Sequence, residues 1–468
     1  MRPLSMGLAA LLLLLLSSLP SVEAAPLHPY RTAAGLDTLV AKGPHAGDCE
    51  RCHTMHGQSD LVYVHALLGP DENSLCDVCH DTPWAGGSYA GTGLYLGSSH
   101  AAGNGTVWPG PNPPPRTEAD AAGKCLNCHD PHGWPDANGL VPKLAIGREE
   151  TLCLTCHDGA PASTDIRSDL VKTFRHPVTD RTGRHEGPLE SLPSSFAASP
   201  TDNRHAECTD CHNPHVGTAD VAGIPPAPAL SRTNLGVSRV LVQNGAAGAP
   251  PAFTFAAGSD TLSGPVAEYQ LCFKCHSSWT TQPSGQTDLA RALNPGNASY
   301  HPVEAVGRDA TIPADAFVPG WSAGSLTRCG DCHGGDLAGA PRGPHGSSYR
   351  YILKQPYTAS SQPRVMTSQE ACFACHSYDV YADPSASDAV RAASRFNKPG
   401  VDKGHAEHVG EEHVPCYACH VTHGAPDRRH LVATGRVPGI ISHSETAGGG
   451  TCQPTCHASQ SYTINYAR

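Results

Sequence analysis

The placement of the cysteines constrains this chain more than any other feature of its sequence. All 20 cysteines fall into close pairs, and a histidine directly follows the second member of every pair. Nine pairs have two residues between the cysteines: Cys49/Cys52-His53, Cys76/Cys79-His80, Cys125/Cys128-His129, Cys153/Cys156-His157, Cys208/Cys211-His212, Cys272/Cys275-His276, Cys329/Cys332-His333, Cys372/Cys375-His376 and Cys416/Cys419-His420. The tenth pair, Cys452/Cys456-His457, has three residues between its cysteines. No cysteine is left over for another purpose.

The motif Cys-x-x-Cys-His is the attachment site of a c-type haem. Two thiols three residues apart lie on one side of a helical turn, where each can form a thioether with a haem vinyl group. The next histidine lies on the same face and reaches the iron. We therefore predict ten covalently attached haem c groups, each with its motif histidine as the proximal ligand. In the tenth motif the extra residue must bulge to keep both sulfurs within reach.

Two other interpretations of the cysteines fit the pattern less well. An exported chain rich in cysteine normally carries a disulfide framework, but such a framework does not require a histidine after every second cysteine. Zinc sites built from Cys-x-x-Cys do not require that histidine either, and an oxidising compartment would threaten their thiolates. The spacing favours haem.

The motifs come in doublets, whose first cysteines are at positions 49, 125, 208, 329 and 416. This spacing indicates five copies of one unit. We predict haem-pair repeats at residues 25–90, 91–170, 171–295, 296–390 and 391–468. Repeat 3 contains an insertion in which Val237–Gln243 and Ala252–Phe255 are rich in β-forming residues and are separated by Asn244-Gly245. This pattern predicts a surface hairpin, either a decoration or a contact for a partner.

Ten further histidines recur at equivalent places and are candidates for the second axial ligand of each iron. The histidine that follows the first motif of a repeat is here called the trailing histidine; an insertion displaces it in repeat 4. The trailing histidines are His56, His132, His215, His345 and His423. The linker histidines, in the Gly/Pro-rich stretches outside the motifs, are His45, His100, His176, His301 and His405.

We expect each trailing histidine to cross to the other haem of its own pair and so to lock the two haems together. Other histidines are then alternates or surface groups: His28, His185, His205, His408, His413, His430 and His443. His45 lies four residues before a first cysteine, so it fits either set.

Composition predicts an unusual interior. The chain has 48 glycines and 42 prolines, while charged residues make up 16% and aromatic residues 6%. Such a chain breaks helices and strands often and has few large side chains for a core. We therefore predict mostly irregular coil, with short α-helices at the haem-binding motifs and few short β-hairpins. Stacked haems would supply the missing apolar surface.

The amino terminus indicates export. Arg2 precedes an apolar run from Leu8 to Leu16 and a small-residue site at Val22-Glu23-Ala24, which together predict a signal peptide over residues 1–24. The run is about half the 20 residues that a transmembrane helix needs, so we predict no transmembrane segment. The expected location is extracellular or at the cell surface, or else periplasmic. The net charge of −11 offers no basic face for nucleic acid.

The doublets resemble the doubled Cys-x-x-Cys-His cytochromes, a family of multihaem proteins found in metal-respiring bacteria. The signature is Cys-x-x-Cys-His-x-Pro-His-Gly followed by Leu-Cys-x-x-Cys-His, and the likeness covers nearly all of the chain after residue 24. It implies haem-stacked pairs, two histidine ligands on each iron, and electron transfer across or beyond the outer membrane. Some relatives polymerise into conductive filaments.

The expected function is that of a non-enzymatic electron conduit. Its partners would be other cytochromes, like subunits of a filament or extracellular acceptors. The alternative is a multihaem reductase of a small anion, such as nitrite or a sulfur oxyanion, with one haem that keeps an open coordination position. The surplus of histidines over haems disfavours the reductase, although the haem at Cys452/Cys456 would be the place for an open site.

Overall fold

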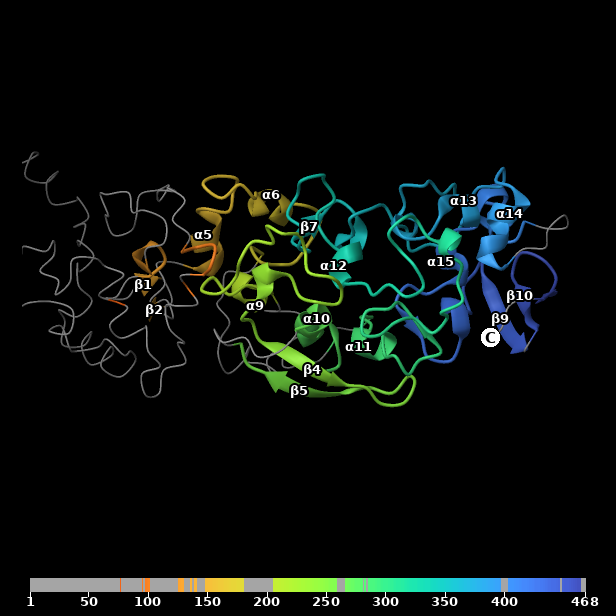
Figure 1. Ribbon diagram of the computed structural model, residues 1–468, viewed down its shortest axis with the longest axis horizontal. Coiled ribbons are helices and arrows are strands. Elements are labelled where there is room, and N and C mark those ends of the chain that lie inside the picture. Colours follow the sequence, from red (N-terminus) through yellow and green to blue (C-terminus); the bar gives the residue numbers. More distant parts are fainter. Residues whose placement is uncertain are drawn as a thin grey trace, which may run out of the picture. The chain divides into compact units, whose positions relative to one another are not determined.

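The computed structural model describes residues 76, 95, 97–101, 125–129, 135–136, 139–140, 148–180, 205–258, 266–280, 282, 285–396, 403–446 and 448–463. These residues belong to two compact units. In the first unit, the 3-10 turn η4 (Cys125–Asn127) precedes two short antiparallel strands, β1 (Pro135–Asp136) and β2 (Gly139–Leu140). The second unit contains all the other described residues (Figure 1).

The helices of the second unit are short. The α-helices are α5 (Glu149–Leu154), α6 (Ile166–Leu170), α9 (Cys208–Cys211), α10 (Glu268–His276), α11 (Leu289–Ala292), α12 (Cys329–Cys332), α13 (Tyr378–Tyr381), α14 (Asp388–Arg391) and α15 (Cys416–Cys419). The 3-10 turns are η6 (Arg232–Asn234), η7 (Ala314–Ala316), η8 (Arg350–Ile352), η9 (Ala371–Ala374), η10 (Ala392–Ser394) and η12 (Arg429–Leu431), and η11 (Glu407–Glu411) is a π-helix. Within the described ranges no helix has the length and apolar character needed to cross a membrane.

Most described motifs share one local geometry, a single helical turn that ends at the histidine. The histidine N–H donates to the carbonyl of the first cysteine in six motifs, at 2.9–3.0 Å: those of His129, His157, His212, His333, His376 and His420. An aspartate within two of these motifs starts the turn, since Asp210 and Asp331 accept the N–H of the residue before the first cysteine. The turn places both cysteines and the histidine close together, as the spacing predicts.

Two of these motifs do not have the expected α-helix. Cys125 lies in the 3-10 turn η4 and Cys128 follows directly after it. The N–H of Cys128 donates to the carbonyl of Cys125 at 3.2 Å, and the N–H of His129 donates to the same carbonyl at 3.0 Å. Because one carbonyl accepts from residues three and four positions later, the turn is tightened into the 3-10 form. The turn η9 shows the same change, with the N–H of Cys375 donating to Cys372 at 3.4 Å. The expected α-helix is therefore wrong at Cys125/Cys128 and at Cys372/Cys375.

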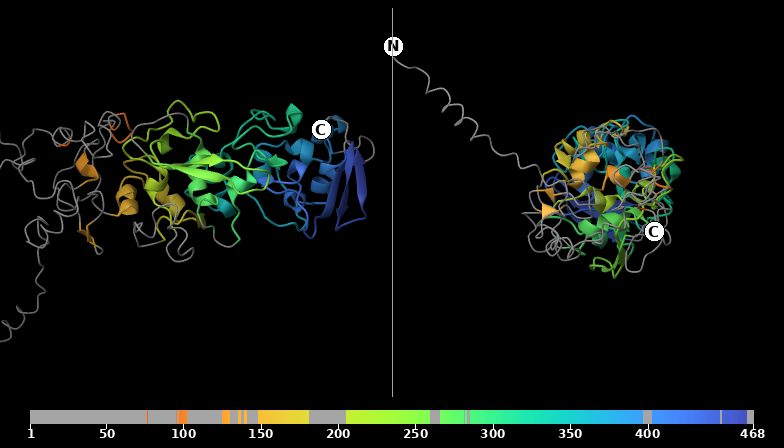
Figure 2. Two further views of the ribbon diagram at one scale, coloured as in Figure 1. Left: turned by 90° about the horizontal axis from the view of Figure 1, so that it is seen from below. Right: turned by 90° about the vertical axis from the view of Figure 1, so that its left-hand side faces the viewer.

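The strands form small antiparallel sheets. Two of these sheets join segments that are far apart in the sequence: β3 (Phe174–Arg175) pairs with β7 (Gly346–Ser347), and β6 (Ser299–Tyr300) pairs with β8 (Gly424–Ala425). Another sheet joins β9 (Ile440–Thr446), β10 (Gly449–Pro454) and β11 (Gln460–Thr463) in the order β11-β10-β9. These three strands lie at the end of the second unit that carries the C-terminal residues (Figure 2).

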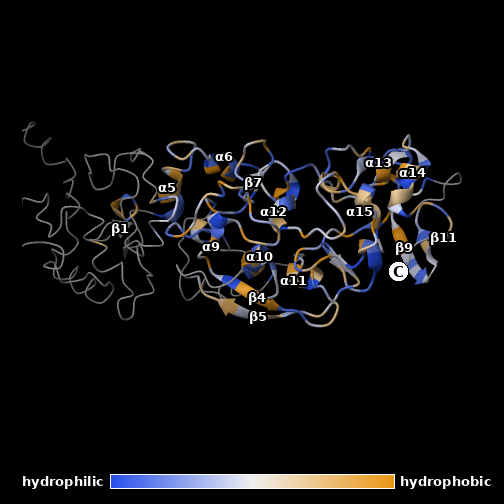
Figure 3. Ribbon diagram, viewed as in Figure 1, coloured by the Kyte–Doolittle hydropathy of each residue, from blue (hydrophilic) through white to orange (hydrophobic). Residues whose placement is uncertain are grey.

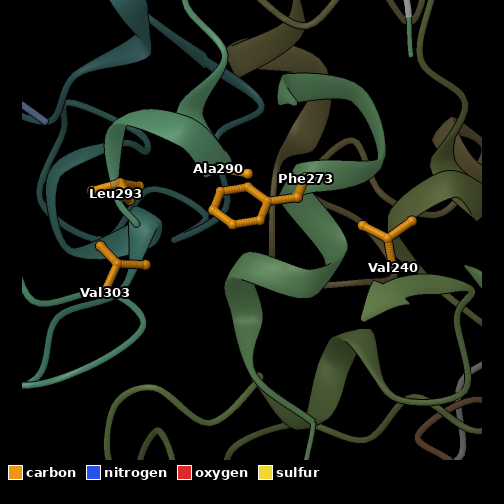
Figure 4. Close-up of a cluster of buried hydrophobic side chains, with 5 residues drawn as sticks. All are labelled: Val240, Phe273, Ala290, Leu293 and Val303. Atoms are coloured by element: carbon orange, nitrogen blue, oxygen red, sulfur yellow. The ribbon is translucent and has the colours of Figure 1, made fainter. Parts of the chain in front are cut away.

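The predicted hairpin of repeat 3 is present and is formed by β4 (Arg239–Gln243) and β5 (Ala252–Ala256). It is not a decoration, because one of its faces belongs to a hydrophobic core. Fully buried Val240 packs in one cluster with Phe273 of α10, Ala290, Leu293 and Val303 (Figure 4). The clusters of the second unit are small, and apolar and polar residues alternate along its short elements (Figure 3).

Replacing Phe273 with Ala removes the side chain at the centre of this cluster. A buried Phe→Ala change typically lowers the free energy of unfolding by about 3–5 kcal/mol, and we expect such a loss in denaturant unfolding of the holoprotein. Leu241→Ala is the control, because Leu241 follows Val240 on β4, lies on the opposite face of the hairpin and is 40% exposed, and its effect should stay below about 1 kcal/mol. Equal stability of the two variants would show that the cluster does not hold the hairpin on α10.

Candidate haem-binding sites

Histidine rings face one another in pairs throughout the second unit. In each of six pairs, one ring belongs to a motif and the other lies outside the motifs. The distances between ring centroids are 6.0 Å for His100/His157, 6.1 Å for His176/His276, 6.1 Å for His212/His345, 6.5 Å for His333/His423, 6.2 Å for His405/His420 and 6.2 Å for His408/His457.

This spacing fits two imidazoles that bind opposite sides of one metal ion. A bond between a metal and an imidazole nitrogen is about 2 Å long, so two such rings hold their centroids about 6 Å apart. The two cysteines beside each motif histidine supply the thiols that a c-type haem requires. The described residues therefore fit a haem with two histidine ligands at each of these six places.

Hydrogen bonds set the tautomer of the motif histidines. Nδ1 of His212, His333 and His420 lies 3.0, 2.7 and 2.8 Å from the backbone oxygens of Thr233, Tyr351 and His430, respectively. A carbonyl oxygen only accepts, so Nδ1 carries the proton, and Nε2 has the lone pair that can bind a metal. A ligand histidine commonly donates its other N–H to such a partner.

The linker histidines are held in the same way, by the backbone next to a trailing histidine. His176 donates from Nδ1 to the carbonyl of Pro344 at 2.6 Å, and its backbone N–H donates to the carbonyl of His345 at 3.1 Å. Strand β3 ends just before His176 and β7 begins just after His345, and these two strands pair directly beside this contact. One junction thus positions two histidines whose rings face His276 and His212, the two motif histidines of repeat 3.

A second junction repeats this arrangement. His301 donates from Nδ1 to the carbonyl of Thr422 at 2.5 Å, and its N–H donates to the carbonyl of His423 at 2.9 Å, beside the β6–β8 pair. The ring of His423 faces His333. Burial, together with nearby His301, lowers the pKa of His376 to about 4. The second junction therefore places His423 opposite the first motif of repeat 4 and His301 near the second.

Burial keeps the trailing histidines neutral. Burial, helped by neighbouring His212, lowers the pKa of His345 to about 3. Burial and nearby His333 lower the pKa of His423 to about 4 in the same way. A neutral imidazole is the form that binds metals, so these rings are in the form that a metal requires.

An ion-pair cluster reinforces the first junction. Lys172 Nζ lies 2.5 Å from Asp336 Oδ1 and 2.6 Å from Asp169 Oδ1, and these side chains are largely buried. The N–H of Ser348 also donates to Asp336, at 3.0 Å. Burial alone would raise the pKa of Asp336, but Lys172 and Ser348 lower it to about 2. The cluster ties the segment before His176 to the segments on both sides of His345.

Glutamates that precede second motifs contact the first motif of the next repeat. Glu149 accepts from the N–H and hydroxyl of Thr209 at 2.5 and 2.7 Å, and Glu268 accepts from the N–H of Gly330 at 2.9 Å. Burial raises the pKa of both carboxyl groups. Each glutamate lies four residues before the first cysteine of a second motif, as does Glu72. This shared position in the sequence was the signal that would have revealed the contact.

The thiols of successive motifs also lie close together. The Cys272 thiol hydrogen bonds with Cys329 of the next repeat, which together with burial holds the pKa of Cys272 well above its usual range. Cys372 and Cys416 form the corresponding contact between repeats 4 and 5. Within repeat 5, burial raises the pKa of Cys419 to about 11, with a further contribution from nearby Cys452. The attachment thiols thus follow one another from repeat 3 to repeat 5 in sequence order.

The attachment cysteines of repeat 2 are divided between the two compact units. Cys125 and Cys128 belong to the first unit, whereas Cys153 and Cys156 belong to the second. Each motif has its own one-turn geometry, because His129 and His157 both donate their N–H to the first cysteine of their motif. The haem site at Cys128 is therefore supported by its local turn alone, and its expected pairing with the second motif of the repeat stays a prediction.

The tenth motif has a different backbone. Cys452 lies in β10, opposite Gln460 of β11 and His443 of β9, whereas Cys456 and His457 are exposed in the β10–β11 connection. The β9–β10 register shifts between Gln453 and Pro454, where the residue left without a partner is Ile441 of β9. This shift is not in the motif strand, so the bulge expected within the motif stays a prediction.

The predicted ligands fall into three groups. Several lie outside the described residues: Cys49, Cys52, His53, Cys79, His80, His45, His56 and His132. His215 is described, and its ring centroid lies 6.0 Å from that of Tyr95. The remaining trailing and linker histidines lie at the two junctions or in the pairs above.

Two expectations about the histidines need correction. Two of the described trailing histidines do not face the other motif of their own repeat: His345 and His423 face the first motif of the preceding repeat, because the junction strands carry them there. His408, which we placed among the alternates, faces His457. Its position three residues after His405 on one helical segment was the available signal.

Comparisons with known proteins agree with the site. Residues 119–162, which contain both motifs of repeat 2, match the model of a family described as the doubled CXXCH motif. No match was found among curated proteins or among solved structures. The CXXCH motifs indicate covalent binding of haem c with its iron, and the doubled motif is consistent with an electron-transferring multihaem c-type cytochrome.

Replacing Asp336 with Asn should weaken the first junction in a pH-dependent way. The pKa of Asp336 in the folded protein, about 2, lies below the ordinary value of 3.8. Its carboxylate therefore stabilises the fold above the ordinary value and loses that effect as the pH falls toward 2. We expect the variant to unfold at lower denaturant concentration than the parent at pH 7, with the difference shrinking below pH 4. Asp315→Asn, at an exposed position, is the control; a pH-independent difference would contradict the assignment.

Proposed function

We propose that this protein is a decahaem c-type cytochrome that carries electrons outside the cytoplasm. The facing histidine rings carry the proposal, because they place two imidazoles about 6 Å apart beside a pair of attachment thiols at six separate places. When bound, the haems supply one-electron redox chemistry at iron. The chain attaches them, orients them and excludes water.

The two junctions support a rule for the axial ligands. For repeats 3 and 4, the first-motif iron takes its second ligand from the trailing histidine of the following repeat. The second-motif iron takes its second ligand from the linker histidine that precedes the motifs of its own repeat, such as His176 for the iron of His276. His100, which faces His157, fits this rule for the second motif of repeat 2. The two distal ligands of one haem pair are thus held together by one backbone junction.

Ligation by two histidines favours an electron carrier over a reductase. A reductase of a small anion needs an iron with an open position for its substrate. At each of the six described pairs the position opposite the motif histidine is filled by another imidazole. A low-spin iron with two strong ligands changes little between redox states, which suits rapid electron transfer.

The thiol contacts support a continuous path for electrons. Cys272 contacts Cys329, and Cys372 contacts Cys416, so haems attached to them would be neighbours across the boundaries between repeats. Burial raises the pKa of Cys211 to about 12, and nearby Cys272 and Cys275 contribute, so the two motifs of repeat 3 are also adjacent. We infer an ordered row of haems along the second unit.

The proposed setting is extracellular, at the cell surface or in the periplasm. The predicted signal peptide and the use of c-type haem support export. The partners that suit this function are other cytochromes, like subunits and extracellular electron acceptors. The net charge of −11 favours partners with a positively charged docking face.

The proposal predicts the spectrum of the fully oxidised holoprotein. We expect ten haems per chain by pyridine haemochrome assay on protein of known concentration, and a low-spin ferric electron paramagnetic resonance spectrum without a high-spin signal. Dithionite should reduce all of the haems. A high-spin signal near one haem per chain in the unmodified protein would favour the reductase, and a chain purified without haem would overturn the cytochrome assignment.

Replacing His345 with Ala tests the ligand rule at a single iron. Because His345 faces His212, we expect about one haem per chain to become high-spin and to bind carbon monoxide when reduced, with the haem count unchanged. His430→Asn is the control: the ring of His430 lies outside the six pairs, and Asn tolerates its positive φ of 54°. A low-spin spectrum in the His345→Ala protein would mean that another residue serves this iron.

A further inference from the structure

Repeat 5 pairs its motif histidines differently from repeats 3 and 4. In repeats 3 and 4 the first-motif histidines, His212 and His333, face the trailing histidines His345 and His423. His420 of repeat 5 instead faces the linker histidine His405 at 6.2 Å. Its second motif, at His457, faces His408 at 6.2 Å. Both facing rings therefore come from one short segment, residues 404–412.

The backbone of this segment presents the two rings to neighbouring motifs. Its helical hydrogen bonds run from the N–H of His408 to the carbonyl of Gly404 at 3.2 Å and from the N–H of Glu412 to Glu407 at 2.9 Å, the second being the wider turn of the π-helix η11. Single π-turns of this kind are frequent at functional sites. Nδ1 of His408 donates to the carbonyl of Gly404 at 2.8 Å, which leaves Nε2 as the metal-binding nitrogen.

Aromatic packing holds both rings from one side. The ring of Phe396 lies 5.1 Å from His405, 6.0 Å from His408 and 5.5 Å from Tyr462 of β11. The ring of Tyr381 contacts His405 at 5.2 Å. His405 is thus a partly buried imidazole held between Tyr381, Phe396 and the motif histidine His420.

The segment is anchored on repeat 4. Val409 is buried in a cluster with Met366, Phe373 and Ala382. Gly410 lies so close to this surface that a Cβ at its position would clash with the carbonyl oxygen of Ala382. The N–H of Val414 donates to the carbonyl of His408 at 2.7 Å and closes the segment. These contacts within the protein fix the position of the segment without any contribution from the haems of repeat 5.

We propose that residues 404–412 form a cap that completes both iron sites of the last repeat from within the chain. His405 is the second ligand at the iron of His420, and His408 is the second ligand at the iron of His457. The proposal rests on the proposed function. It assigns the second ligands of repeat 5, where the ligand rule of repeats 3 and 4 does not hold. It also makes the Cys-x-x-x-Cys-His motif a six-coordinate electron-transfer site and not an open catalytic one.

The cap has a consequence for assembly. In repeats 3 and 4 the first-motif iron would take its second ligand from the next repeat. His405 takes that place at the iron of His420. The two iron sites of repeat 5 therefore need no histidine from another repeat or from a second copy of the chain.

The test uses two variants of the holoprotein, His405→Ala and His408→Ala, and their combination. Each single variant should convert about one haem per chain to the high-spin form, and each should gain one carbon monoxide site per chain when reduced; the double variant should show two. Added imidazole should restore the low-spin spectrum by filling the vacated position. His413→Asn is the control, because His413 is exposed in the adjoining turn and has a φ of 58° that Asn tolerates.

Mass analysis of the peptide that contains Cys452 and Cys456 separates the ways in which the test can fail. If the peptide carries haem and the spectrum of His408→Ala stays low-spin, His408 is not the ligand and the cap proposal is overturned, while the cytochrome assignment stands. If the peptide carries no haem while the other motifs do, the cap is wrong at its second site only. A chain without haem at any motif would overturn the proposed function itself.

Discussion

Most facing pairs of histidine rings join a motif to a distant part of the chain, and the rest of the described structure depends on this pairing. The rings of His212 and His345 come from repeats 3 and 4, and the rings of His176 and His276 come from segments that are 100 residues apart. Two ligands of one flat haem must approach from opposite faces. One segment of the chain therefore has to lie on each side of every haem. At the junctions, short strands join two such segments.

This pairing makes the repeats interdependent in a way that simple stacked repeats are not. In a solenoid each repeat contacts only its neighbours. Here the junction of His176 and His345 joins the segment before the repeat 3 motifs to repeat 4 and encloses both motifs between them. The hydrophobic clusters are small, and one of them, around Val240 and Phe273, is built from a hairpin that only repeat 3 possesses. Haem would contribute the apolar surface that these clusters do not provide.

The sequence predicted the chemistry of the haem sites better than it predicted which histidines pair with one another. The spacing of the cysteines predicted one-turn motifs, and the six histidine N–H bonds to first cysteines show that geometry, although the turn at Cys125/Cys128 is a 3-10 turn and not the expected α-helix. Asn244-Gly245 between two β-rich runs predicted the hairpin. The motif opposite the trailing histidine was predicted wrongly. Nearness along the chain favours a motif of the same repeat, whereas the pairing of β7 with β3 holds His345 beside repeat 3. His408 was placed among the alternates, because its one local signal, a position three residues after His405, does not show which motif it faces.

The sequence by itself determined which groups are attached and what chemistry they can perform. Covalent attachment and metal ligation depend on the kinds of residue and their local spacing, and Cys-x-x-Cys-His contains both within one turn. Only the tertiary structure decided which histidine meets which motif, because the two ligands of an iron are brought together by contacts between segments far apart in sequence. The same reason applies to repeat 5, where His420 faces the linker histidine His405 and not a trailing histidine.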